Sequence, residues 1–346
     1  DDQNQQNNHY NSGMAEQFRG VNLGGWLVLE KWLTPSVFAG TDAVDEHTLS
    51  LAAGGKQRIR KHRHAFVTKA DFRWLVRHGI THVRIPVGYW VFEPLDGYIP
   101  CVTQLDHAMQ WAEEYGLKVL IDLHAAHGSQ NGFDNSGHRG AAEWFTRRDY
   151  QQQTLTVLEQ IAHRYGNSSA LWGIELLNEP TPTVRQHRIL RRFHRQAYDR
   201  LHSILPVHIA IVFHDAFHSW LSASTFWRYR RHSNHPIIMD CHWYAFSFTG
   251  NNLTVYLQRS ARLRRLLLRF LQLWQPVLVG EWSSVLPQRF FDATPREQHY
   301  ALLGRNVAMQ QQAYRHAAGW YYWNYKADGD GMWNFRSLVE SGVFVL

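Results

Sequence analysis

The chain has 346 residues, of which 45% are hydrophobic, 19% charged and 14% aromatic, and this composition excludes an intrinsically disordered protein. No stretch approaches the ~18 consecutive apolar residues of a membrane-spanning helix, and Cys101 and Cys241 are too few for a disulfide framework. The net charge is +7, with 36 Lys and Arg against 29 Asp and Glu. Because indole rings are hard to bury fully, we expect several of the 15 tryptophans to line a cleft or an interface.

Residues 1–17 are expected to form a disordered leader ahead of the folded chain. The first 13 residues are rich in Asn and Gln and have no apolar period. Met14 has the position of a native start, so the residues before it look added or left by processing. No apolar signal segment follows Met14, and two unpaired cysteines suit a reducing compartment. We therefore expect a cytoplasmic protein; the alternative is a secreted chain whose signal has been removed.

From Phe18 to the C-terminus, short β-branched runs alternate with longer amphipathic segments. The runs predict strands at 18–23, 82–87, 118–123, 171–177, 208–213, 237–243, 276–280 and 319–325. The segments between them predict helices at 68–78, 104–115, 150–165, 184–204, 219–230, 254–274 and 295–317. Thr68 with Asp71 resembles a capping box, and Gly79 and Gly116 follow helices as C-caps.

This alternation has no internal linker, so it predicts an α/β fold with one domain over residues 18–346, a single (β/α)8 TIM barrel. A doubly wound sheet is the alternative. It would require a glycine-rich phosphate turn after the first strand, and the run at 20–25 lacks the necessary glycine spacing.

Catalytic groups of such a barrel lie at the C-terminal ends of its strands. Glu179 in IELLNEP and Glu281 in VLVGEW each end an apolar strand. Two poorly solvated carboxyls that repel each other have separated pKa values, which glycoside hydrolysis requires. Each glutamate alone would also suit an ion pair with Arg84 or a helix cap, but the pair together favours catalysis. Other reactive or polar residues end the remaining strands: Glu30, Arg84, His124, Asn178, Asp215, His242, Tyr244 and Trp323.

Seven segments carry a resemblance to a known family: RGVNLGGWLVLEKWLTPS, VRIPVGYW, IDLHAAHGSQNGFDNSG, GIELLNEP, HDAF, GEWS and GWYYWNYK. They resemble the family 5 glycoside hydrolases, and specifically the fungal-type exo-β-1,3-glucanases, from about Phe18 to the C-terminus. The resemblance implies a retaining hydrolase without a cofactor, acting on a β-glucan oligosaccharide or β-glucoside. It identifies Glu179 as the acid/base and Glu281 as the nucleophile.

The resemblance also implies roles for the residues around this pair. Tyr244 and Arg84 would stabilise the Glu281 carboxylate, and Asn178 would hold the sugar 2-hydroxyl. His124 and His242 would bind sugar hydroxyls and orient the glutamates, and Trp323 would form the floor under the terminal glucose. Three further residues would form walls of the pocket. Glu30 and Asp134 would close it around the outermost hydroxyls of the terminal glucose, as exo action requires. Phe133 would form one side of the +1 site, which binds the leaving group.

Ser247 stands where the resembling enzymes have the second aromatic residue of the +1 site, and Phe246 or Phe248 would have to replace it. The segment between Glu281 and the last helix is shorter than in the resembling secreted fungal enzymes. An acceptor side with fewer walls is more open, so we expect a broad aglycone range. A glucosidase for small or lipid-linked glucosides, or a transglucosylase, is therefore an alternative. A non-catalytic carbohydrate-binding barrel is disfavoured because the glutamates and their supporting residues are all present.

His124, His127 and His242 could be imagined as the three protein ligands of a metal ion. The resemblance, however, gives His124 and His242 roles in binding sugar hydroxyls, so we expect no metal. Basic runs occupy 56–64, 185–195 and 259–270. The first has the composition of a nucleic-acid or anionic-surface patch, but solvated faces of barrel helices explain all three more simply, and we expect no nucleic-acid partner. The strongest alternative concerns the third run, whose arginines and apolar residues also suit an anionic membrane surface.

Overall fold

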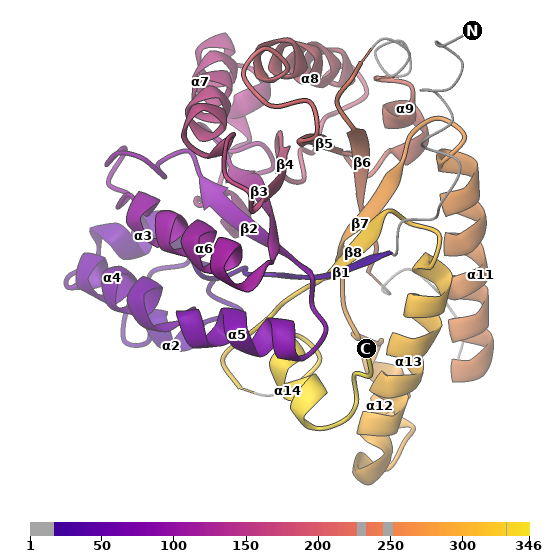
Figure 1. The fold of residues 1–346 in the computed structure, drawn as a ribbon. Helices are drawn as coiled ribbons and strands as arrows, with labels where there is room; N and C mark the ends of the chain where they lie inside the picture. The colour runs from indigo at the N-terminus through magenta and orange to yellow at the C-terminus, as the bar shows by residue number, and fades with distance from the viewer. Residues whose placement is uncertain (1–16, 227–232, 245–251, 330) are drawn as a thin grey trace, which may run out of the picture.

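In the computed structural model, which describes residues 17–226, 233–244, 252–329 and 331–346, eight parallel strands close into a barrel in sequence order. Helices surround the barrel (Figure 1). The strands are β1 (Phe18–Asn22), β2 (His82–Gly88), β3 (Lys118–Ala125), β4 (Leu171–Glu175), β5 (Ala210–His214), β6 (Ile237–His242), β7 (Val277–Trp282) and β8 (Gly319–Tyr322). This confirms the predicted TIM barrel. The predicted leader at residues 1–17 lies, but for Gln17, outside the described residues.

All eight predicted strands are present, although their ends differ by a few residues. β4 and β8 end at Glu175 and Tyr322, earlier than expected, because the apolar residues that follow them belong to buried loops. Pairing of β1 with β8 closes the barrel, with Phe18 opposite Gly319. Between β6 and β7 the register shifts at Cys241/His242, which places His242 opposite Glu281. One irregularity in the ladder thus brings together two of the predicted site residues.

The predicted helices are also found, and Thr68 and Asp71 form the expected capping box. The described residues also contain five helices that the sequence does not predict, because they are short or have little apolar period: α2 (Pro35–Phe38), α3 (Glu46–Leu51), α4 (Gly55–Ala65), α12 (Gln288–Asp292) and α14 (Phe335–Glu340). The predicted helix at 219–230 is shorter, and residues 227–230 lie outside the described chain. The helices are α2 (Pro35–Phe38), α3 (Glu46–Leu51), α4 (Gly55–Ala65), α5 (Lys69–Arg77), α6 (Val102–Tyr115), α7 (Arg148–Tyr165), α8 (His187–Leu201), α9 (Ser219–Ala223), α11 (Leu253–Leu271), α12 (Gln288–Asp292), α13 (His299–Tyr314) and α14 (Phe335–Glu340).

Many tryptophans belong to the core and not to a cleft. The fully buried ones are Trp26, Trp90, Trp144, Trp282 and Trp320. Trp282 packs edge-on against Trp320 and Tyr322 at ring-centroid distances of 5.3 and 5.1 Å. Such edge-to-face contacts stabilise by about 0.5–1.5 kcal/mol each beyond area burial. The expectation of cleft-lining tryptophans holds for a smaller set, described with the site below.

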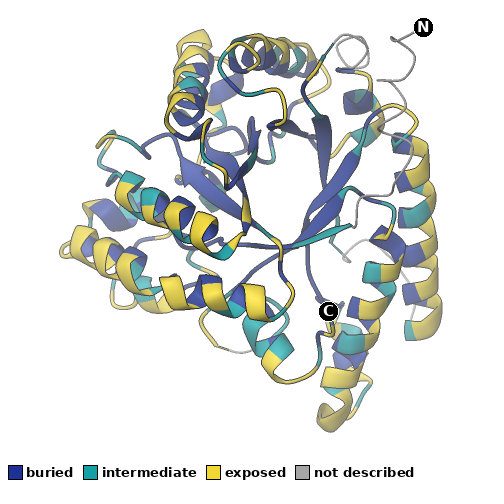
Figure 2. Cartoon of the chain, viewed as in Figure 1, coloured by how far each residue is buried: buried dark blue, intermediate teal, exposed yellow. Residues whose placement is uncertain are grey.

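The first basic run, at 56–64, is largely helix α4, and one of its arginines faces inward. Arg63 is 2% exposed; its guanidinium pairs with Glu46 of α3 and donates to the carbonyls of Leu27 and Ile99, each at 2.8 Å. Glu46 accepts from the Leu29 amide at 2.8 Å. This pair therefore fixes the loop after β1, the loop that leads to Glu30. The other positions of α4 are largely exposed, as Figure 2 shows.

Substituting Arg63 by Ala tests whether this buried pair supports the fold. The change leaves Glu46 as an uncompensated buried charge, and we expect the free energy of unfolding to fall by about 3–5 kcal/mol. Urea denaturation measures it, with Arg60→Ala, on the exposed side of the same helix, as the control expected to change by less than about 0.5 kcal/mol. Equal losses in the two variants would contradict the structural role of Arg63.

Candidate active site

A cavity of about 240 Å³ opens at the C-terminal end of the barrel, the end where barrel enzymes place their chemistry. The predicted residues that line it are Glu30, His124, Phe133, Asp134, Glu179, Tyr244, Glu281 and Trp323. The lining residues that the sequence analysis missed are Trp32, Asn135 and Trp333. The volume is below the ~300–1,000 Å³ of sites for drug-sized ligands, and it suits one sugar ring.

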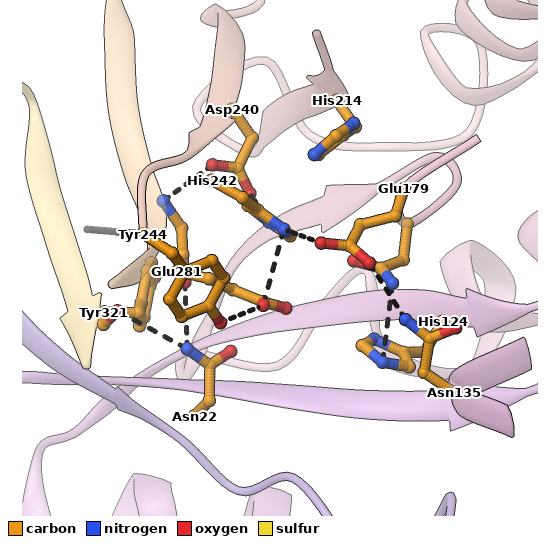
Figure 3. Close-up of polar contacts among 12 residues, drawn as sticks. Asn22, His124, Asn135, Glu179, His214, Asp240, His242, Tyr244, Glu281 and Tyr321 are labelled. Atoms are coloured by element: carbon orange, nitrogen blue, oxygen red, sulfur yellow. Dashed lines mark hydrogen bonds and ion pairs between the residues drawn. The ribbon is translucent and has the colours of Figure 1, made fainter. Parts of the chain in front are cut away.

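Glu179 stands in the loop after β4, and its backbone has φ = 41°, in the left-handed region. Such strain persists only where the surroundings hold it; here Asn131 donates to the Glu179 carbonyl at 3.3 Å. The carboxylate accepts from Asn135 Nδ2 at 2.9 Å and from His242 Nδ1 at 2.8 Å (Figure 3). Its side chain is 15% exposed, so it reaches the cavity.

Glu281 is near the end of β7, and three neighbours hold its carboxylate. Tyr244 Oη donates to Oε2 at 2.6 Å, and Arg84 donates to Oε1 at 3.0 Å. His242 Nδ1 lies 3.4 Å from Oε2. These contacts favour the ionised form of a carboxylate, as expected for the residue that the sequence analysis identified as a nucleophile.

One ring nitrogen therefore lies between the two predicted catalytic carboxylates. His242 Nδ1 is 2.8 Å from Glu179 and 3.4 Å from Glu281, so the nearest oxygens of the two groups cannot be farther apart than these distances combined. This limit brings the two carboxyl groups close enough to act on one bond of a bound ligand, as the paired carboxyls of glycosidases do.

The charges within this group shift the pKa values of all three side chains. Burial opposes the charge on His242, but the carboxylates of Glu281 and Asp240 raise the pKa of His242 well above its ordinary value. Burial also raises the pKa of Glu179, but the hydrogen bond and charge of His242 bring it below the ordinary value. Burial raises the pKa of Glu281, against the attraction of His242 and with the repulsion of Glu179. These shifts favour the protonated form of His242 and the ionised form of Glu179.

Arg84 is fully buried beneath the cavity and binds carboxylates from neighbouring strands. Its Nε donates to Glu175 of β4 at 2.7 Å, and its Nη2 lies 3.1 Å from Asp122 of β3. Asp122 and Glu175 are not among the predicted site residues, although each is an acidic residue inside an apolar strand. Because such a charge is buried only when it is paired, an acidic residue within an apolar run is the sequence signal that could have identified them.

Glu30 and Asp134 lie in the wall of the cavity, as expected. Burial and the charge of Asp134 raise the pKa of Glu30 well above the ordinary value, and burial raises the pKa of Asp134. Trp32 Nε1 donates to Glu30 Oε2 at 2.9 Å. The other oxygen of Glu30, Oε1, is buried and has no hydrogen-bond partner among the described residues.

Four aromatic side chains, those of Trp32, Phe133, Trp323 and Trp333, give the cavity flat surfaces. Trp323 is 2% exposed and lies parallel to the ring of His124 at 5.7 Å. Trp333 packs edge-on against Trp32 at 5.0 Å. Phe133 projects from the loop after β3 and is 55% exposed, as expected for a wall at the mouth. Trp32 lies in the segment at 19–36 that resembles family 5, but that segment also contains the buried Trp26; Trp333 lies outside the quoted motifs, so the sequence could not separate either from core tryptophans.

Several candidates are placed away from the cavity or outside the description. Asn178 is fully buried, and its side chain accepts from Arg84 at 2.9 Å; its role at a sugar 2-hydroxyl stays a prediction. Asp215 accepts from Ser219 and from the Phe217 amide and does not line the cavity. Phe246 and Phe248, the candidates for the +1 site, lie outside the described residues, as does Ser247.

The described residues contain two groups whose ligand atoms approach within 4.8 Å of one another, Glu179–His214–His242 and Glu175–Asp240–His242. Neither includes His124 or His127. His124 Nδ1 is bound to Asp122 at 2.6 Å, and His127 packs on Tyr89 at 3.8 Å between ring centroids. The three-histidine cluster considered from the sequence is therefore not formed.

A closed β/α barrel with two glutamates facing each other across a small cavity is the arrangement of a glycoside hydrolase. The sequence profile of the family described as Cellulase (glycosyl hydrolase family 5) matches residues 50–329. The chain belongs to glycosyl hydrolase family 5.

Two curated relatives match over nearly their whole length. The Probable glucan 1,3-beta-glucosidase A of Emericella nidulans is 34% identical over 378 residues, covering 96% of this chain and 90% of the relative. The Glucan 1,3-beta-glucosidase 2 of Wickerhamomyces anomalus is 33% identical over 385 residues, covering 95% and 88%. Among solved structures, the rutinosidase from Aspergillus niger has a TM-score of 0.78 at 22% identity, covering 95% and 98% of the two chains; this supports the fold alone.

Substituting Tyr244 by Phe tests how Glu281 is held. Because the lost hydroxyl donates to the ionised carboxylate, its removal raises the pKa of Glu281, and activity that needs this carboxylate ionised is lost at a higher pH. We expect the acid limb of kcat/KM for an aryl β-glucoside to move upward by about one pH unit. Tyr314→Phe, which removes a hydroxyl bound to Arg264 in the helical layer, should leave the limb unchanged. Coincident limbs in all three proteins would contradict the contact.

Proposed function

We propose that the chain is a retaining, exo-acting β-glucosidase that removes terminal glucose from β-1,3-linked glucans. The observation that carries the proposal is the pair Glu179 and Glu281 held on one nitrogen of His242 at the base of a cavity the size of a single sugar. The names of the two curated relatives support the linkage, since both are called glucan 1,3-β-glucosidases.

The proposed reaction is a double displacement. Glu281 attacks the anomeric carbon while the bond to the leaving oxygen breaks and Glu179 gives that oxygen a proton, which yields a glycosyl-enzyme ester and the shortened glucan. Glu179 then takes a proton from water, whose oxygen attacks the same carbon and releases glucose and the Glu281 carboxylate. Two inversions at one carbon retain the β configuration.

In this mechanism the proton that Glu179 delivers comes from its bond with His242. A protonated His242 beside an ionised Glu179 and a neutral His242 beside a protonated Glu179 differ only by transfer along a 2.8 Å hydrogen bond. The alkaline limb of the pH profile therefore belongs to the shared proton and not to either residue alone, and the acid limb belongs to protonation of Glu281. Because burial raises the pKa of Glu281, the acid limb lies above the ordinary carboxyl range.

Exo action is supported by the two acidic residues in the cavity wall. Glu30 and Asp134 line the cavity, and in the proposed complex they bind the outermost hydroxyls of the terminal glucose. A site built to hydrogen-bond a hydroxyl discriminates strongly against ligands that cannot supply it. An internal segment of a glucan would have to continue through this wall.

A second candidate is a glucosidase of broad aglycone range, extending to small or lipid-linked glucosides. The observation that favours it is the exposure of the aromatic residues at the mouth, where Phe133 is 55% and Trp32 45% exposed. Flat exposed aromatic rings bind sugars and other apolar faces alike. The glucose contacts are the same in both candidates, so only the leaving group separates them.

The roles of the two glutamates are tested by Glu179→Gln and Glu281→Gln. We expect kcat on laminaribiose to fall about 10²–10⁴-fold for the first, because the general acid is lost, and to background for the second. Glu93→Gln, on the surface, is the control and should keep full activity. Azide added to Glu281→Gly should restore cleavage of an activated aryl β-glucoside and give α-glucosyl azide, because azide enters from the face vacated by the carboxylate. A β-glucosyl azide from that variant would contradict the assignment.

The substrate proposal is tested by product analysis on laminari-oligosaccharides and by kcat/KM on β-1,3-, β-1,4- and β-1,6-glucobioses, an aryl glucoside and a lipid glucoside. We expect glucose alone at early times and a preference for the β-1,3 linkage. Glu30→Ala should lower kcat/KM for laminaribiose and the aryl glucoside by the same factor, about tenfold or more, because both share the terminal glucose. Early release of laminaribiose would contradict exo action, and equal kcat/KM for the aryl, lipid and disaccharide substrates would favour the second candidate.

A further inference from the structure

Helix α11 has an apolar stripe on its outer side, away from the barrel. Leu263, Leu266 and Phe270 are each more than half exposed, and Leu273, just past the helix end, is 74% exposed. The first three are spaced as i, i+3 and i+7, which puts them on one face. The opposite face, with Tyr256, Leu257, Leu268 and Leu271, is buried. Exposed residues mark most of the outer length of this helix in Figure 2.

The charges beside this stripe are all positive. Arg259, Arg262 and Arg269 are exposed on the same side of α11, and the sequence from Leu253 to Gln275 contains no Asp or Glu. The C-terminal end of α13 adds to them, since Gln272 donates to the His316 carbonyl at 2.7 Å. The pKa of His316 is lowered first by burial and then by the charges of Arg315, Arg269 and Arg265. These three arginines therefore lie near the His316 ring.

Helix α8 provides the contrast within the same chain. It contains the second basic run, and Arg192 and Arg195 are exposed on it, but its large apolar residues Leu190, Phe193 and Leu201 are buried. The expectation of a solvated basic face is therefore met for α8. On α11 the arginines lie among exposed leucines and a phenylalanine, and solvation alone does not explain that combination.

We propose that the outer face of α11, defined by Arg259, Arg262, Leu263, Leu266, Arg269, Phe270 and Leu273, docks onto an anionic lipid membrane surface. An amphipathic helix with arginines beside its apolar residues lies in the plane of the lipid headgroups, with the apolar side chains among the acyl chains and the guanidinium groups at the phosphates. Each cation near an anionic leaflet strengthens binding several-fold. None of the described helices has the length and apolar character needed to span a bilayer, so the contact is peripheral.

The charge of this face argues against the other occupants. A second copy docked through the same face would bring the arginines of the two chains together, and like charges directly opposed destabilise an interface. A nucleic acid would match the arginines but not Leu266, Phe270 and Leu273, whose desolvation needs an apolar partner. A lipid surface satisfies both kinds of side chain.

The docking leaves the catalytic cavity free. The chain passes from the C-terminal end of α11 directly into β7, so Phe270 and Leu273 lie near the strand ends opposite those that carry Glu281. α11 lies along the outer wall of the barrel in Figure 1. With this helix in the membrane plane, the mouth of the cavity opens sideways along the surface. The proposal is therefore independent of which glucoside the site cleaves.

The test is co-sedimentation of the full chain with phosphatidylcholine vesicles, with and without phosphatidylserine, at low and at high salt. We expect sedimentation only with phosphatidylserine and weakening by salt. Arg262→Gln/Arg269→Gln and, separately, Leu266→Ser/Phe270→Ser should each lower the apparent affinity by roughly tenfold or more. The matched control is Arg192→Gln/Arg195→Gln on α8, which removes the same net charge and should keep wild-type binding. Thermal unfolding midpoints verify that each protein is folded.

Each alternative result overturns the proposal. No sedimentation with phosphatidylserine at low salt means that the face does not bind membranes. An equal loss in the α8 control means that only net charge is sensed. Concentration-dependent dimers in light scattering that Leu266→Ser/Phe270→Ser abolishes would identify a second copy as the occupant. The charge pair and the apolar pair are separate changes, so if one variant misfolds the other still decides.

Discussion

The site depends on one buried guanidinium. Arg84 is fully buried in β2, and its five donors reach side chains from β1, β3, β4 and β7, together with Asn178 after β4. A buried cation without partners would cost several kcal/mol, as would each of the carboxylates around it. The barrel closes with these charges paired, and the planar fork of arginine can bind several partners in fixed directions where lysine could not. Glu281 is one of the partners, so the same network that makes the polar interior tolerable also fixes the orientation of the proposed nucleophile.

Above this network, His242 sets the protonation of the site. Its ring nitrogens lie between Asp240 on one side and the two glutamates on the other. Three carboxylates around one imidazole keep it charged, and the charged imidazole in turn lowers the pKa of Glu179. A mechanism with two carboxylates alone leaves the proton on one of them. In the proposed mechanism, the third group is a place for the proton that Glu179 delivers, next to both glutamates.

Much of this arrangement could be predicted from the sequence, for identifiable reasons. Glu179 and Glu281 each interrupt an apolar run, which identifies the strand that precedes or contains each glutamate, although β4 itself ends at Glu175. The supporting residues Arg84, Tyr244 and His242 follow from motifs shared with family 5. The pKa shifts of the glutamates could not be predicted in this way. They depend on the position of His242, which a register shift at Cys241/His242 sets, and no sequence pattern encodes that shift. Asn135 and Trp333 belong to irregular loops and have no period. The basic runs show the same limit, since similar compositions turn Arg63 inward on α4 and leave Arg269 outside on α11.

The residues that line the catalytic cavity include four acids, Glu30, Asp134, Glu179 and Glu281, and among the described residues that line it there is no lysine or arginine. Arg84 and His242, which do not line the cavity, contact two of these acids from the side of the barrel interior, so in this part of the site the carboxylates face the ligand and the cations lie behind them. In the proposed reaction positive charge develops at the anomeric carbon, within reach of these carboxylates. A ligand with a protonated nitrogen at that position would therefore resemble the transition state more closely than a neutral sugar does.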